Sequence, residues 1–123
     1  MTMKRVIIDT DPGIDDTAAI FLALASPELH VEALTTVYGN GTIADCTRNA
    51  LVVLETAGRS DTPVYQGAGK PLIGAPTYGS HVHGSDALGD VNVGLTEEPL
   101  GGAKWTTRPE PPFAPRGGRG VCG

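Results

Sequence analysis

The sequence has few aromatic residues, few cysteines and no long hydrophobic run, and each shortage excludes a class of protein. Only 5% of the 123 residues are aromatic, which argues against a surface on which nucleic-acid bases stack. Cys46 and Cys122 lie far apart in unlike surroundings, so neither a disulfide framework nor a zinc site is expected. No apolar stretch is long enough for a transmembrane span or the core of a signal peptide. We therefore expect a cytoplasmic protein with no membrane partner.

Basic residues are also scarce, and their distribution along the chain is uneven. The chain has 9 Lys and Arg against 14 Asp and Glu, which argues against nucleic acid as a partner. Residues 101–123 reverse this balance, and ten of them are Gly or Pro. Such a segment buries too little apolar surface to offset its ordering entropy. We therefore predict a domain over residues 1–98 and a Gly/Pro/Arg-rich tail over 99–123, either disordered or produced by a shifted reading frame.

The first 70 residues alternate between strand and helix patterns. The apolar, β-branched run from Lys4 to Asp9 predicts a buried strand, and Pro12-Gly13 then predicts a turn. The pattern continues with a helix over 15–26, a strand over 31–37, a helix from about 42 to 57 and a strand over 62–67. This order predicts an α/β fold with an open, mostly parallel sheet and flanking helices, here truncated. A loop is expected after Lys70.

A cluster of four carboxylates follows the first predicted strand. Its members are Asp9, Asp11, Asp15 and Asp16. Each one alone could be explained by turn or capping chemistry, but four together repel one another unless a cation compensates. Crowded oxygen ligands suit Ca²⁺ or Mg²⁺. Asn40 follows the next strand, and it should join the cluster because ligands bind at the carboxyl ends of parallel strands. The sequence therefore predicts a metal site at this edge.

The pattern Asp-x-Asp at a strand end leaves more than one function open. Haloacid-dehalogenase-like phosphotransferases use the first Asp as a nucleophile, and Thr35-Thr36 could then supply the phosphate-binding hydroxyl. That chemistry does not need the Pro-Gly-Ile-Asp-Asp continuation found here. A further alternative is a non-catalytic remnant that binds Ca²⁺ or ribose weakly.

Five motifs in order favour another class of enzyme. VIIDTDPGIDDTAAI, LTTVYGNGT, TRNAL, PVYQGAGKPL and HVHGSDALG resemble the nucleoside hydrolase family of the inosine/uridine-preferring type, segment by segment over about residues 4–96. The resemblance implies hydrolysis of the N-glycosidic bond of ribonucleosides to free base and ribose by a Ca²⁺-bound water. It also implies a homo-oligomer for the full-length form. Ala87 departs from the pattern, because the family usually has Gly there.

The resemblance also implies roles for individual residues. Asp11 and Asp16 would bind Ca²⁺, and Asp11 would also act as the general base on the bound water. Asp15 and Asn40 would contact the ribose. His83 would line the pocket near the nucleobase, and Asp9 would support the ligand residues from behind.

Other parts of the family pattern are not found in this sequence. Family members are much longer, and their later part supplies further calcium ligands, ribose contacts and a His that protonates the departing base. We therefore expect the 123-residue chain alone to bind Ca²⁺ weakly and to be inactive. His81 is expected to be an exposed or structural residue. Asn49 sits mid-helix, where it could satisfy backbone groups across a contact, and the sequence leaves its role open.

Overall fold

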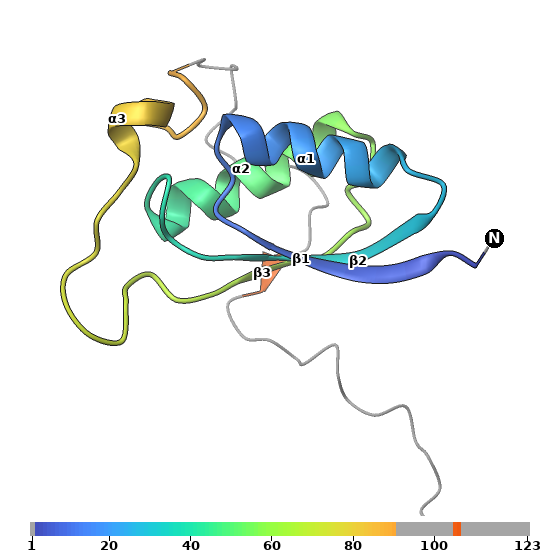
Figure 1. The fold of residues 1–123 in the computed structure, drawn as a ribbon, viewed down its shortest axis with the longest axis horizontal. Helices are drawn as coiled ribbons and strands as arrows, with labels where there is room; N and C mark the ends of the chain where they lie inside the picture. The colour runs from blue at the N-terminus through green and yellow to red at the C-terminus, as the bar shows by residue number, and fades with distance from the viewer. Residues whose placement is uncertain (1, 91–104, 107–123) are drawn as a thin grey trace, which may run out of the picture.

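The computed structural model describes residues 2–90 and 105–106, which form an α/β fold (Figure 1). In chain order the elements are β1 Lys4–Thr10, α1 Ile14–Ala25, β2 Leu29–Thr36, α2 Ile43–Thr56, β3 Val64–Gln66, α3 Ser80–His83 and β4 Trp105–Thr106. Within the described residues the strands make one sheet in the order β1-β2-β3-β4, and every neighbouring pair is parallel. The predicted fold class is confirmed.

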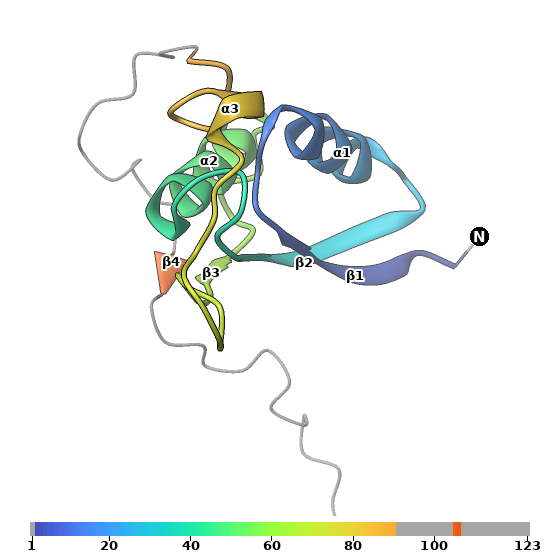
Figure 2. The same ribbon diagram turned by 60° about the vertical axis from the view of Figure 1, so that its left-hand side comes forward.

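Both long helices lie on the same face of the sheet, as the two ribbon views agree (Figures 1 and 2). This follows from the strand order, because right-handed crossovers between strands added in sequence put their helices on one side. The hydrophobic core fills the layer between sheet and helices. It consists of Ile20, Val31, Leu34, Ala50, Val53, Leu54 and Val64.

The two helices begin differently. Thr42 caps α2 as the sequence predicted: its hydroxyl accepts a hydrogen bond from the Asp45 amide at 3.2 Å. In return, Asp45 Oδ2 accepts from the Thr42 amide at 3.3 Å. The residue before α1 is Gly13, which has no side chain to offer, so only the return half of this arrangement exists. Asp16 Oδ2 accepts from the Gly13 amide at 3.2 Å.

Three features differ from the sequence-based expectation. The strand predicted over 62–67 is shorter, and residues 80–83 form the helical turn α3 where a loop was expected. That turn forms because the amides of Val82 and His83 both donate to the Gly79 carbonyl. Trp105 and Thr106, within the segment predicted as a tail, pair with β3 as β4. The other residues of 99–123 lie outside the described part, so the division at residue 98 stays a prediction.

None of the helices in the described ranges is both long and apolar enough to cross a lipid bilayer.

Candidate active site

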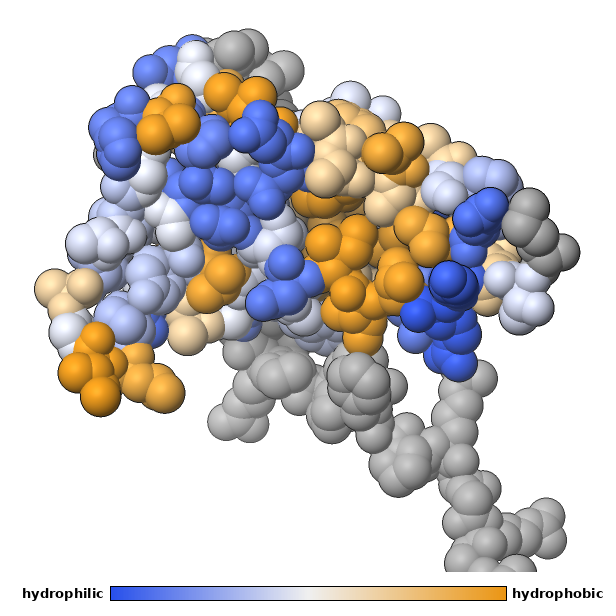
Figure 3. All heavy atoms as spheres, in the orientation of Figure 1, coloured by the Kyte–Doolittle hydropathy of each residue, from blue (hydrophilic) through white to orange (hydrophobic). Residues whose placement is uncertain are grey.

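The predicted site residues gather at the carboxyl ends of β1 and β2, where α1 and α2 also begin. This edge is on the left in Figure 1, beside α3. Figure 3 shows hydrophilic residues gathered over that end of the molecule, whereas hydrophobic residues gather toward the middle of the same face. Strand ends and helix starts meet here because each parallel strand leads directly into its crossover helix.

Asn40 links the two predicted calcium ligands. Its backbone amide donates to Asp11 Oδ2 at 2.9 Å. Its side-chain Nδ2 donates to the Asp11 carbonyl at 2.9 Å and to Asp16 Oδ2 at 3.0 Å. An Asn side chain has two N–H donors, and both are therefore used. Only Oδ1 is left for a ligand, so a ribose hydroxyl at Asn40 would have to donate.

Both oxygens of Asp16 have partners within the first turn of α1 or next to it. Oδ2 accepts from Gly13 and Asn40, and Oδ1 accepts from the Thr10 hydroxyl at 3.3 Å. Asp16 is the third residue of α1, so the positive end of the helix dipole stabilises its negative charge. The carboxylate is therefore held in one place by its local role in the fold as well as by Asn40.

The Asp11 carboxylate is packed against Gly39. A Cβ atom built on Gly39 would overlap Asp11 Oδ2, so a side chain there would displace the carboxylate. Gly13 is enclosed in the same way: its Cβ would lie 2.8 Å from Asn40 Nδ2 and 3.0 Å from His83 Nδ1. These two glycines allow the turns after β1 and β2 to approach closely.

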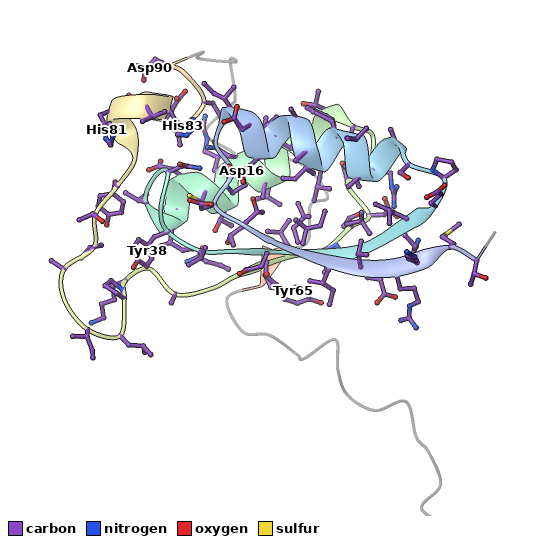
Figure 4. The ribbon with its side chains drawn as sticks, in the orientation of Figure 1. Asp16, Tyr38, Tyr65, His81, His83 and Asp90 are labelled. Carbon is purple, nitrogen blue, oxygen red and sulfur yellow. The ribbon has the colours of Figure 1, made fainter. Side chains whose placement is uncertain are left out.

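His83 reaches the site from α3. Its Nδ1 accepts from the Ile14 amide at 3.4 Å, which places the imidazole against the start of α1. His81 is exposed, as expected, and Figure 4 shows it on the outer side of α3, away from Asp16. The structure therefore brings His83, and not His81, to the start of α1.

Asp9 and Asp15 lie at the margin of this group. Asp9 is exposed, and its Oδ1 accepts from the Thr35 hydroxyl at 2.6 Å on the neighbouring strand. Because Ile8 faces the helices, Asp9 points to the opposite side of the sheet. Asp15 is exposed in the first turn of α1, where a ligand could reach it. The roles predicted for both residues stay predictions.

The structure gives contacts to Asn49 that the sequence left open. This side chain is fully buried on α2, and its Nδ2 donates to the Pro12 carbonyl at 3.2 Å and to the Asp86 carbonyl at 2.9 Å. The signal in the sequence was an Asn in the middle of a predicted helix. That signal indicates a buried contact but does not say which backbone groups are its partners.

Aromatic and backbone contacts also join the loops around the site. The rings of Tyr38 and Tyr78 meet edge to face with centroids 6.3 Å apart. One residue further along each segment, the Gly79 amide donates to the Gly39 carbonyl at 2.8 Å. The segment leading into α3 is therefore attached to the turn after β2.

Two ionisable groups near the site have shifted pKa values. Burial raises the pKa of the Cys46 thiol, so this residue is poorly suited to act as a nucleophile. Hydrogen bonds from the hydroxyl and amide of Ser85 lower the pKa of the exposed Asp90 carboxyl. Both Ser85 and Asp90 line a surface hollow of about 330 Å³, together with Arg48 and Asp86.

The oxygen ligands near Asn40 are of the type that calcium prefers, but they are fewer than it needs. Asp11 and Asp16 offer hard oxygen ligands, which Ca²⁺ prefers, but Ca²⁺ takes about 6–8 of them. Within residues 2–90 and 105–106, no three or more His, Cys, Asp or Glu side chains are grouped so as to hold a metal ion. Two carboxylates are too few to complete a calcium site, so the predicted roles of Asp11 and Asp16 as calcium ligands stay predictions.

Comparison with known proteins identifies the family. Residues 6–116 match the family model described as inosine-uridine preferring nucleoside hydrolase. The chain belongs to this family. The match continues beyond residue 96, where the resemblance found in the sequence ends. The comparisons thus confirm the resemblance and do not favour the phosphotransferase alternative.

Individual relatives agree with this assignment. Uridine nucleosidase 1 of Arabidopsis thaliana is 50% identical over 91 residues, which are 73% of this chain and 27% of the relative. The inosine-uridine preferring nucleoside hydrolase of Crithidia fasciculata is 44% identical over 88 residues, 72% of this chain and 28% of the relative. A solved plant nucleoside hydrolase, the PpNRh1 enzyme, superposes with a TM-score of 0.73 at 49% identity, covering 83% of this chain and 32% of that structure. The chain thus spans about a quarter of the length of these curated relatives.

Proposed function

We propose that this chain provides the carboxylate part of an active site that hydrolyses the N-glycosidic bond of ribonucleosides to free base and ribose. Membership of the nucleoside hydrolase family supports the reaction type. The observation that carries the proposal is the pair of carboxylates at the sheet edge, Asp11 bound by the Asn40 backbone amide and Asp16 bound by the Asn40 side chain.

Each residue of the group has a chemical part in this proposal. Asp11 and Asp16 would hold Ca²⁺, which when bound would orient a water molecule and favour its deprotonation. Asp11 would accept the proton of the water that attacks the anomeric carbon. Its carboxylate is suited to this because Gly39 and Asn40 hold it in one position.

The substrate would be held mainly by hydrogen-bond acceptors. The exposed Asp15 carboxylate and Asn40 Oδ1 can both accept hydrogen bonds from ribose hydroxyls. His83, held against the start of α1, would lie near the base. The names of the relatives include uridine and inosine, so a ribonucleoside is proposed as the substrate without a choice of base. A homo-oligomer is proposed for the full-length form.

We expect no useful turnover of inosine or uridine by the 123-residue chain alone. Two carboxylate ligands leave calcium under-coordinated, and a loosely held metal would position the water poorly. Loss of a general acid alone can cost about 10²–10⁴-fold in rate. Activity should therefore be tested after this segment is built into a longer relative.

A chimera makes that test. The aligned segment of the Arabidopsis uridine nucleosidase is replaced by that of this chain, and release of ribose and uracil is measured. The chimera should hydrolyse uridine, and Asp11→Ala in it should reduce kcat by at least about 10²-fold. Asp61→Ala is the matched control, because Asp61 is an exposed carboxylate on the turn after α2 and pairs only loosely with Arg59.

Two results would contradict the proposal. A chimera that folds like its parent but releases no ribose would show that this segment cannot supply the carboxylate part. Equal turnover in the Asp11→Ala and Asp61→Ala chimeras would show that Asp11 has no role in the reaction. Strong turnover by the 123-residue chain itself would contradict only the expectation that this chain is inactive.

A further inference from the structure

We infer that Asn49 is a positioning residue, which holds the turn after β1 and the loop after α3 at a fixed separation. The inference rests on the proposed function only in so far as these two segments form the active site. Asn49 lies on α2 and is itself too deeply buried to touch a substrate. Its effect would pass through the backbone groups that it binds.

The two hydrogen bonds of Asn49 reach segments far apart in sequence. One ends on the carbonyl of Pro12, which lies between Asp11 and the Gly13 cap of α1. The other ends on the carbonyl of Asp86, in the loop that follows His83. A single planar amide donates both bonds, so the distance between the two carbonyls is set by the geometry of one side chain.

A second hydrogen bond spans the same gap at another place. The Ile14 amide donates to His83 Nδ1, whereas the Gly89 amide donates to the His83 carbonyl within the loop itself, at 2.6 Å. The Ile14–His83 bond is long, at 3.4 Å, and would be a weak tie by itself. Asn49 therefore supplies the stronger connection between the carboxylate turn and the His83 loop.

The remaining atom of the amide carries a cost that the two donors must offset. Asn49 Oδ1 is buried and has no hydrogen-bond partner among the described residues. An unpaired buried carbonyl is costly, but an apolar residue here would take the donor away from both the Pro12 and the Asp86 carbonyl. The position thus keeps a group whose benefit lies in its two donors.

Hydrogen exchange on the 123-residue chain, without calcium or nucleoside, tests the inference. Asn49→Ala removes both donors, and Asn49→Asp removes them while keeping the side-chain volume. Both variants should exchange the Ile14 and Gly89 amides about tenfold or more faster, while the Leu34 amide of the sheet changes much less. Thr47→Val is the control, because Thr47 is also buried on α2 but its hydroxyl bonds to Ile43 and Thr36 instead.

The outcomes separate positioning from general stability. If the Asn49 variants speed exchange equally at Ile14, Gly89 and Leu34, or match the pattern of Thr47→Val, the inference is wrong. If the variants do not fold, the inference is tested instead on the side-chain amide of Asn49 in the wild-type chain. Both Asn49 Nδ2 protons should be protected and resolved in NMR spectra, and rapid exchange of either would overturn the inference.

A calcium titration separates this inference from the proposed function. Local loosening at Ile14 and Gly89 in a chain that shows no calcium response would support Asn49 as a positioning residue and contradict the proposed metal site. Calcium binding by the wild type, with no local loosening in the variants, would support the proposed metal site and contradict Asn49 as a positioning residue.

Discussion

Asn40 Nδ2 lies 3.0 Å from Asp16 Oδ2, although the two residues belong to different segments of the chain. The same nitrogen also donates to the Asp11 carbonyl. One amide thus fixes the turn after β2 to the turn after β1, at the point where two carboxylates would otherwise repel each other. Asn40 thus binds both of the predicted calcium ligands, the Asp11 carboxylate through its backbone amide and the Asp16 carboxylate through its side chain.

Asn40→Asp should therefore make the fold depend on calcium. The change removes two donors and adds a third carboxylate beside Asp16, which should lower the free energy of unfolding by about 2–3 kcal/mol in EDTA. Calcium should recover more stability in this variant than in the wild type, because a cation relieves the added repulsion. Thermal unfolding in EDTA and in millimolar calcium measures both effects. Thr42→Ala is the control: it removes the α2 cap and should cost about 1 kcal/mol with no change in the calcium response. If calcium stabilised the Asn40→Asp and Thr42→Ala variants equally, the prediction would be wrong.

Gly39→Ala should impair calcium binding more than stability. The added methyl would displace the Asp11 carboxylate, so the rise in melting temperature on adding calcium should shrink or vanish. Gly58→Ala is the control: Gly58 has φ of +66° in open space, so Ala there costs about 1–2 kcal/mol of strain without touching the site. An unchanged calcium response in Gly39→Ala would show that Asp11 is not a ligand.

Ala87 and Gly41 should be energetically coupled. Ala87 is buried with φ of +63°, at the position where the sequence departs from the family's usual Gly. A Cβ on Gly41 would lie 3.2 Å from the Ala87 Cβ, so the two positions compete for space. Gly41→Ala should be destabilising alone and less so in the presence of Ala87→Gly, with a coupling energy of about 0.5–2 kcal/mol in a double-mutant cycle. Additive free energies of unfolding would show that the two residues are independent.

The buried Cys46 thiol should resist alkylation and make stability fall in alkaline solution. Its pKa is raised in the folded state, so the folded chain keeps a proton that the unfolded chain loses above about pH 8.5. The stabilising contribution is complete below that pH and declines as pH rises toward the folded pKa. Chemical unfolding against pH, compared with Cys46→Ala, measures this decline, and peptide mapping after iodoacetamide measures the protection. Rapid labelling of Cys46 in the native chain would contradict the assignment.

The local sequence determined the elements and the identity of most site residues. The β-branched run ending at Asp9, the turn at Pro12-Gly13 and the cap at Thr42 are short-range signals, so strands, helices and their order could be predicted. A strand that ends in carboxylates puts them at the ligand edge of any parallel sheet. For this reason the amino-acid sequence alone predicts that Asp11, Asp16 and Asn40 lie close together.

Only the tertiary structure decided how those residues are connected. The Asn40 amide could have met a ligand, but its two donors go to Asp11 and Asp16, because the turns after β1 and β2 approach closely at Gly13 and Gly39. Likewise, the sequence marked Asn49 as unusual but could not name Pro12 and Asp86 as its partners. Hydrogen-bond partners distant in sequence are chosen by the packing of whole elements against one another, which no local pattern encodes.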